Sequence, residues 1–86
     1  MQKYKIRKKT ELLLGTKLVE PDGAYQLLLQ NLSDSEDIII DRYLKIMPTG
    51  TYILGEFPYC EIVDAVEIQI PTGGTAALVR MYSDVI

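Results

Sequence analysis

The chain has 86 residues, a formal net charge of −3 and 48% hydrophobic residues, with no His, no Trp and a single Cys. A chain of this length buries only roughly 60 to 65% of the surface that its unfolded form exposes, so we expect a single compact domain over residues 1–86. The lack of His removes the commonest general base and metal ligand, and a lone Cys60 excludes an internal disulfide. With no secretion signal and no apolar run of membrane-spanning length, this composition predicts a cytoplasmic protein, made by a bacterium or in a virus-infected host cell.

The stretch from residue 3 to residue 9 is the most basic part of the chain. Its strict alternation up to Arg7 predicts a half-buried strand with Tyr4 and Ile6 on the apolar face. Five of the nine basic residues and none of the 12 acidic ones lie here: Lys3, Lys5, Arg7, Lys8 and Lys9. We favour a solvated edge strand that its lysines protect from pairing with other chains. Contact with a nucleic acid through this strand is the alternative, which the sequence pI of about 4.8 opposes.

The sequence Pro21-Asp22-Gly23 predicts a tight turn, because Pro sets the φ that a turn needs and Gly adopts positive φ at little cost. We expect Leu18 and Val19 to pair across this turn with residues 25–28 as an antiparallel hairpin. Residues 24–32 also have the spacing of one face of a short helix, and we favour a strand at their start.

Residues 34–47 are open to two interpretations. Ser33 and Glu36 have the spacing of a helix capping box, and the terminating Pro48 agrees with it, so a helix is favoured. The β-branched triplet Ile38-Ile39-Ile40 favours a strand instead. We place the fold in the α+β class, β-rich, with a small antiparallel sheet of about five strands and at most one helix near residues 34–47.

The turn sequence Pro-Thr-Gly occurs twice, at residues 48–50 and 71–73. The second copy separates residues 60–70 from residues 75–82, and both segments alternate in a way that is typical of strands. We expect these two segments to form a hairpin closed by residues 71–75. One face of each strand is apolar: Val66, Ile68 and Ile70 in the first, and Ala77, Val79 and Met81 in the second.

No motif indicates a reaction, a cofactor or a metal site. The acidic residues Asp34, Glu36 and Asp37 lack the spacing of a calcium loop, and a helix dipole would explain them more simply. Cys60 has no His partner, and its neighbour Glu61 disfavours the thiolate. We therefore expect a protein that is not an enzyme and that holds neither cofactor nor metal.

Phe57 and Tyr59 lie in a loop that contains Gly and Pro, where aromatic side chains can anchor a partner. We expect a non-catalytic binding module that acts by protein–protein interaction, such as a small inhibitor or regulator of a partner with a basic surface. The predicted binding residues are Phe57, Tyr59, Glu56, Asp34, Glu36 and Asp37. Because a small domain cannot bury all of its apolar residues, a homo-oligomer is expected as well.

Two further function classes stay open. One is a small-ligand or nucleotide binder whose pocket lies at a subunit interface, where Tyr side chains, Arg42 and Arg80 converge. The other is a minimal enzyme that uses carboxylates such as Asp41 or Asp64, which lack a paired base.

Overall fold

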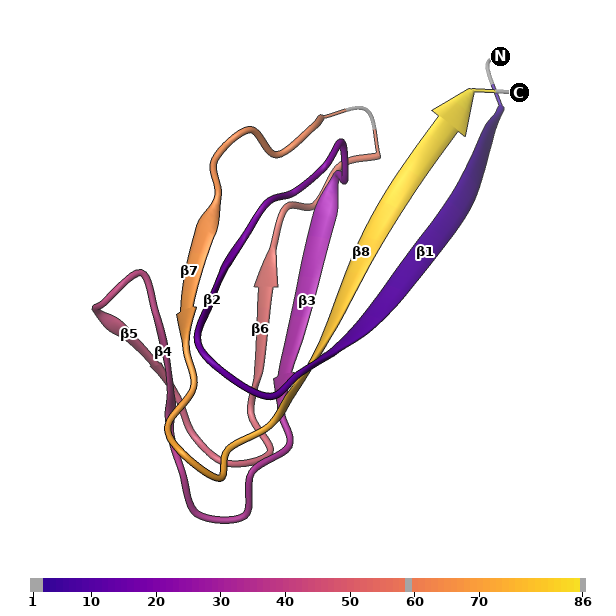
Figure 1. The fold of residues 1–86 in the computed structure, drawn as a ribbon. Coiled ribbons are helices and arrows are strands. Elements are labelled where there is room, and N and C mark those ends of the chain that lie inside the picture. Colours follow the sequence, from indigo (N-terminus) through magenta and orange to yellow (C-terminus); the bar gives the residue numbers. More distant parts are fainter. Residues whose placement is uncertain (1–2, 59, 86) are drawn as a thin grey trace.

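The computed structural model describes residues 3–58 and 60–85, which form eight strands in two antiparallel sheets packed face to face (Figure 1). Sheet A has the strand order β1 (Tyr4–Leu13), β8 (Ala76–Val85), β3 (Gln26–Asn31) and β6 (Thr51–Leu54). Sheet B has the order β2 (Lys17–Val19), β7 (Val66–Gln69), β4 (Ile38–Ile40) and β5 (Leu44–Ile46). The expected β-rich, antiparallel character is confirmed, whereas the number of strands exceeds the expected five and the described residues contain no helix.

Six of the seven connections carry the chain from one sheet to the other, and this overturns two of the expected hairpins. Both predicted turns form: Ala24 N donates to Pro21 O at 3.0 Å, and Gly74 N donates to Pro71 O at 2.9 Å. However, β2 pairs with β7 rather than with β3, and β7 pairs with β2 and β4 rather than with β8. The strands on each side of these turns both bury an apolar face, so they lie in opposite sheets and face each other across one core.

The prediction of a helix near residues 34–47 is wrong, because this segment contains strands β4 and β5. The β-branched triplet of β4 pairs with β5, from Ile38 opposite Ile46 to Ile40 opposite Leu44. Ser33 does not cap a helix, since its hydroxyl accepts a hydrogen bond from Thr75 N at 3.0 Å. The tertiary contact therefore outweighs the local capping signal.

The turn between β4 and β5 has positive φ at both central residues, Asp41 (48°) and Arg42 (71°), as a type I′ turn requires. Tyr43 N closes it by donating to Ile40 O at 3.1 Å. After β5, Pro48 and Thr49 form a second turn, with Thr49 at a φ of 66° and Gly50 N donating to Met47 O at 2.9 Å. Pro48 thus ends a strand and redirects the chain from sheet B to sheet A.

The core lies between the sheets and draws on both. Its buried apolar side chains are Leu13, Val19, Ala24, Leu27, Leu29, Ile38, Ile40, Val66, Ile68, Ile70, Ala76, Leu78 and Tyr82. The predicted apolar face of residues 66–70 is therefore confirmed as a core face. In contrast, the predicted apolar faces at Tyr4 and Ile6 and at Ala77, Val79 and Met81 point away from this core.

A buried polar residue, Asn31, joins several parts of the fold. Its side chain is fully buried, and its Nδ2 donates to Glu36 O at 2.8 Å and to Ile46 O at 3.0 Å. Its Oδ1 accepts from Ser33 N at 2.9 Å. This one amide therefore satisfies backbone groups of the β3–β4 connection and of β5 at the place where the chain crosses between the sheets.

We expect Asn31→Ala to lower the free energy of unfolding by about 2–4 kcal/mol, because three backbone groups would lose their partner. Gln30→Ala is the matched control, since Gln30 is the exposed neighbour on the same strand and its replacement should cost less than about 0.5 kcal/mol. Urea unfolding followed by circular dichroism measures both. Equal effects of the two substitutions would contradict the role given to Asn31.

Candidate functional site

The outward face of sheet A carries a band of apolar side chains, and no strand of the described residues packs on it. In the strand registers, Thr10 lies opposite Val79, Val79 opposite Leu28, and Leu28 opposite Ile53, so one row of side chains crosses all four strands. The next row contains Leu12, Ala77, Gln30 and Thr51. Leu12 is 60% exposed and Ile53 is 57% exposed. We call this surface, which continues along β1 and β8 to Met81, Ile6 and Tyr4, the outer face of sheet A.

The outer face of sheet A is also almost free of charge. Lys8, opposite Met81, is the one charged residue at an outward position of the described strands of this sheet. Both acidic residues of these strands, Glu11 and Asp84, belong to the opposite face. An antiparallel sheet with one solvated face normally alternates between apolar inside and polar outside, and charge depletion is a feature of interface centres. This surface therefore has the composition of a contact surface.

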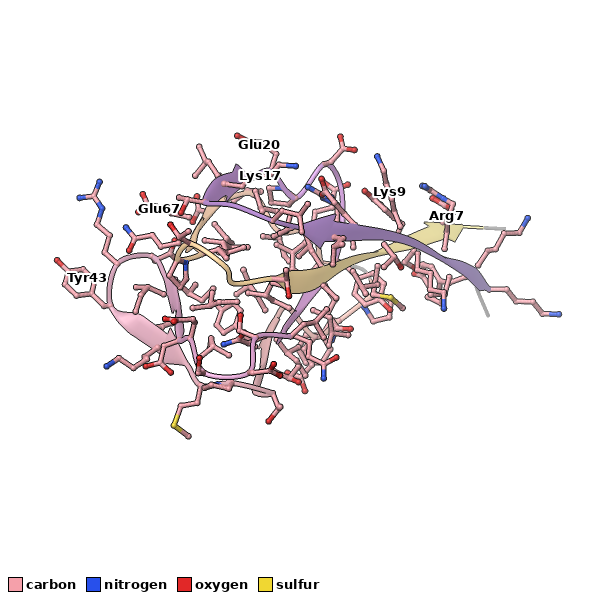
Figure 2. The ribbon with its side chains drawn as sticks, turned by 60° about the horizontal axis from the view of Figure 1, so that its bottom comes forward. Arg7, Lys9, Lys17, Glu20, Tyr43 and Glu67 are labelled. Carbon is pink, nitrogen blue, oxygen red and sulfur yellow. The ribbon has the colours of Figure 1, made fainter. Side chains whose placement is uncertain are left out.

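The outward face of sheet B differs from that of sheet A because it includes several charged and polar residues, as expected for a sheet face exposed to solvent. Its side chains come from Leu18, Glu67, Gln69, Ile39 and Lys45. At one end of this sheet the turn between β4 and β5 presents Tyr43, which is 90% exposed (Figure 2). In the same turn, Arg42 Nε lies 3.6 Å from Glu67 Oε1. A cavity of about 330 Å³ near Thr16, Ile39 and Pro71 opens on the same side.

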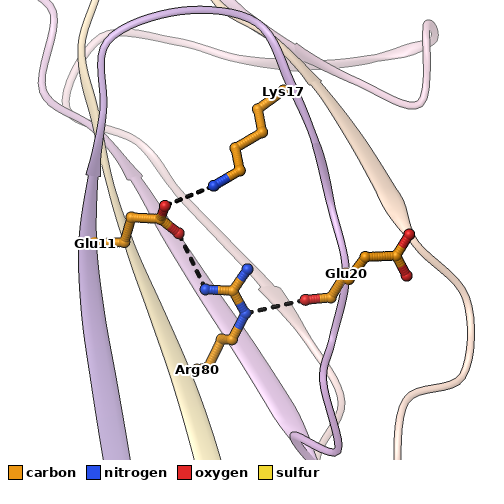
Figure 3. A network of polar contacts seen from close by, with 4 residues as sticks. All are labelled: Glu11, Lys17, Glu20 and Arg80. Carbon is orange, nitrogen blue, oxygen red and sulfur yellow. Dashed lines mark hydrogen bonds and ion pairs between the residues drawn. The ribbon is translucent and has the colours of Figure 1, made fainter.

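A second cavity, of about 360 Å³, lies beside β1 and contains a polar network (Figure 3). Arg80, which is buried, donates from Nη1 to Glu11 Oε1 and from Nε to the Glu20 backbone oxygen, both at 3.0 Å. Lys17 Nζ donates to Glu11 Oε2 at 2.6 Å. These contacts, first that from Lys17 and then that from Arg80, hold the pKa of the Glu11 carboxylate below its ordinary value. Glu11 neutralises a buried cation, so the network has a structural purpose.

The described residues of the predicted binding site do not come together on one surface. Phe57 is half exposed and Glu56 exposed in the loop after β6, while Tyr59 lies outside the described residues. Gly55, which begins this loop, has a φ of 89°, and a Cβ there would lie 2.1 Å from Tyr25 O, so the loop is fixed closely against β3 at its start. The predicted acidic residues lie instead on the β3–β4 connection: Asp34 and Glu36, which are exposed, and Asp37, whose carboxylate is 4.0 Å from Lys45 Nζ.

The basic residues at the start of β1 lie on two different sides of the strand. Lys5, Arg7 and Lys9 share one side, and Figure 2 shows Arg7 and Lys9 pointing to the side on which Lys17 lies. Lys8 lies on the other side, with the apolar residues of the outer face of sheet A. Arg7 is engaged within the chain, since its Nε is 3.1 Å from Asp84 Oδ2 and its guanidinium lies 4.4 Å from the centre of the Tyr82 ring.

The structure also shows where the other candidate ligand-binding and reactive residues lie. Arg42 and Arg80 do not converge, because Arg42 pairs with Glu67 on the outward side of sheet B whereas Arg80 lies between the sheets. Cys60 is exposed. Within residues 3–58 and 60–85, no three His, Cys, Asp or Glu side chains are grouped so as to hold a metal ion, and no helix has the length and hydropathy needed to cross a membrane.

Comparisons with protein-family models, curated proteins and solved structures found no match to this chain.

Sequence reasoning missed the outer face of sheet A, although a signal for it exists. Residues 27–29 and 76–79 are apolar at both odd and even positions. A strand with this pattern has two apolar faces, of which a two-layer sandwich can bury only one. The pattern becomes informative once the registers show that both strands belong to the same sheet.

The lowered pKa of Glu11 predicts a dependence of stability on pH. Since the folded-state pKa lies below that of an unfolded glutamate, about 4.3, the carboxylate stabilises the fold above that pH and loses its contribution as the pH falls through the folded-state pKa. We expect Glu11→Gln to lower the melting temperature at pH 7 and to lower it less at pH 3. Glu61→Gln, at an exposed position, is the control. A Glu11→Gln effect of equal size at both pH values would contradict this assignment.

Proposed function

We propose that this chain is a non-catalytic protein-binding module that self-associates through the outer face of sheet A. The observation that supports it is the uncharged row from Thr10 through Val79 and Leu28 to Ile53, which crosses all four strands and is mainly apolar. Removing such a surface from water is favourable in proportion to the apolar area buried. A second copy of the chain is the occupant to which we commit.

The size of the face is sufficient for a dimer. Four strands spaced about 4.8 Å apart, with lengths of several residues at about 3.3 Å each, give a face of roughly 500 Å². Two such faces would bury roughly 1,000 Å², the lower limit of specific interfaces, and would place the dimer among the weaker assemblies. We therefore expect a dimer in equilibrium with monomers at micromolar concentrations.

The charge distribution on the outer face of sheet A is compatible with a second copy as the occupant. The chain carries a net charge of −3, so two copies repel each other over most of their surfaces. The outward positions of sheet A hold no acidic residue, and Lys8 lies toward the β1 side, away from Leu28 and Ile53. Two outer faces can thus meet while the acidic residues of each copy lie away from the interface.

The expected partner with a basic surface, and a role as an inhibitor or regulator, stay predictions. The exposed acidic residues Asp34 and Glu36 lie on the β3–β4 connection, outside the outer face of sheet A. A dimer formed through that face leaves this connection accessible to another protein.

The substitution Ile53→Lys tests the proposed dimer, because it places a charge in the apolar row. We expect it to weaken dimerisation at least tenfold, measured by sedimentation velocity over a range of protein concentrations and by native mass spectrometry. Leu18→Lys is the matched control, since Leu18 is 58% exposed, as against 57% for Ile53, but lies on the outward face of sheet B. Circular dichroism checks that both variants fold.

A wild-type chain that stays monomeric at high micromolar concentration would contradict the proposal. Equal weakening by Ile53→Lys and Leu18→Lys would contradict it too, because it would show that charge alone, rather than its position on sheet A, governs assembly.

A further inference from the structure

We propose that the free edge of β1 binds an extended acidic segment of a partner protein as an added antiparallel strand. The proposal concerns the lateral edge of sheet A and goes beyond the dimer, which uses the outward face of that sheet. It combines three features of β1: free backbone groups, unpaired lysines, and a first part that extends, together with β8, past the end of β3.

The backbone of β1 offers donors and acceptors along its outer side. Leu32 N donates to Thr75 O and Tyr25 N donates to Met81 O, so the odd-numbered residues of β8 face β3. The even-numbered residues of β8 must then face β1, and they pair with its odd-numbered residues, as Arg80 does with Lys9. The N–H and C=O groups of Ile6, Lys8 and Thr10 consequently point away from β8, where β1 is the edge of the sheet.

The outer part of β1 is also incompletely supported. β8 pairs with β1 over residues 76–85 but with β3 only over residues 76–81, so the first residues of β1 and the last residues of β8 form a two-stranded ribbon (Figure 1). This ribbon contributes to the long dimension of the molecule, 46 Å against 20 and 16 Å. Two strands alone are marginally stable, and a third strand provides the missing pairing.

Charge determines which strand fits. Lys5, Lys8 and Lys9 are exposed and form no ion pair within the described part of the chain, whereas Arg7 is held by Asp84. A second β1 is a poor candidate, since antiparallel pairing would set these lysines against one another. A strand that carries Asp or Glu opposite them gains favourable cross-strand pairs instead.

A peptide fits this edge better than a nucleic acid. Phosphate groups accept hydrogen bonds but do not donate them, so they would leave the outward C=O groups of Ile6, Lys8 and Thr10 without a protein-like partner. An added peptide strand satisfies N–H and C=O groups alike. The basic start of β1, for which the sequence left nucleic-acid contact as an alternative, is thus assigned to an acidic peptide.

The register defines the pattern of the bound segment. In an antiparallel strand, a residue opposite Lys9 is followed by one opposite Lys8, and the residue opposite Lys5 comes three positions later. Acidic residues are therefore expected at the first, second and fifth of five positions, with an apolar residue at the fourth, opposite Ile6. The fourth residue would lie on the same side of the sheet as the outer face of sheet A.

Fluorescence anisotropy with a labelled synthetic peptide tests the proposal on the full chain. The peptide has glutamate at its third, fourth and seventh positions, valine at its sixth and threonine at its remaining positions, and lysine replaces each glutamate in the control peptide. We expect binding of the acidic peptide only, and at least a tenfold loss with Lys9→Glu. Lys45→Glu, an equal change of charge on β5, should leave the affinity within twofold.

The backbone contribution requires its own variants. Thr10→Pro removes an outward N–H without removing a bond to β8, so we expect it to abolish peptide binding, while Thr10→Val retains it. If Thr10→Pro fails to fold, a peptide methylated at alternate backbone nitrogens replaces it, and we expect this peptide not to bind the wild-type chain.

The outcomes separate strand addition from simple charge attraction. Binding that responds to Lys9→Glu but not to Thr10→Pro or to peptide methylation would overturn the proposal, as would tighter binding of a thymidine oligonucleotide than of the peptide. A failure of the peptide to bind would also overturn it. Because sedimentation of Ile53→Lys reports on the dimer independently, either proposal can fail without the other.

Discussion

The fold depends on the hydrogen bonds that satisfy the chain where it crosses between the sheets. Asn31 provides three of these bonds, to Ser33, Glu36 and Ile46. At the same end of the sandwich, the Ser33 hydroxyl accepts from Thr75 N, and the Thr16 hydroxyl accepts from Ile70 N at 3.1 Å. Four crossings meet at this end, and uncompensated backbone groups would oppose their burial. The Asn31 amide and the Ser33 and Thr16 hydroxyls therefore complete the hydrogen bonding that backbone pairs such as Leu32 N to Thr75 O leave unmet at this end.

The turns and most strands follow from local sequence, whereas β4, β5 and the choice of strand partners do not. The Pro21-Asp22-Gly23 sequence and the second Pro-Thr-Gly each form the turn that their residue types predict. A turn fixes where the chain reverses, but hairpins and crossings between two sheets both begin with a reversal. The choice is made by burial on the far side of the core, as Ile38, Ile40 and Ile68 illustrate, and that information is spread over distant residues. For the same reason the capping signal at Ser33 was misleading.

The candidate site shows the same division between local and distant information. Alternation in β1 correctly predicts that Tyr4 and Ile6 share a face, but which face meets the core depends on strands more than 60 residues away along the chain. Leu13 is buried, so the odd-numbered side of β1 faces the core and Ile6 faces outward. The apolar half of an apparently ordinary amphipathic strand thus becomes part of an uncovered surface, while the Phe57 loop, the most conspicuous aromatic segment of the sequence, lies elsewhere.

A single strand, β1, connects the two proposed surfaces, and its alternation explains how they coexist. Even-numbered side chains such as Ile6 and Leu12 belong to the outward face of sheet A, and odd-numbered cations such as Lys5 and Lys9 point to the opposite side. The free N–H and C=O groups project in a third direction, within the plane of the sheet. Stacking of two outer faces covers the even-numbered side chains, Lys8 among them, so each copy in a dimer retains the backbone edge of β1 with Lys5 and Lys9. Because an added strand would bring its own outward side chains beside Ile6, the bound segment would enlarge the dimer face, and peptide binding and dimerisation should favour each other.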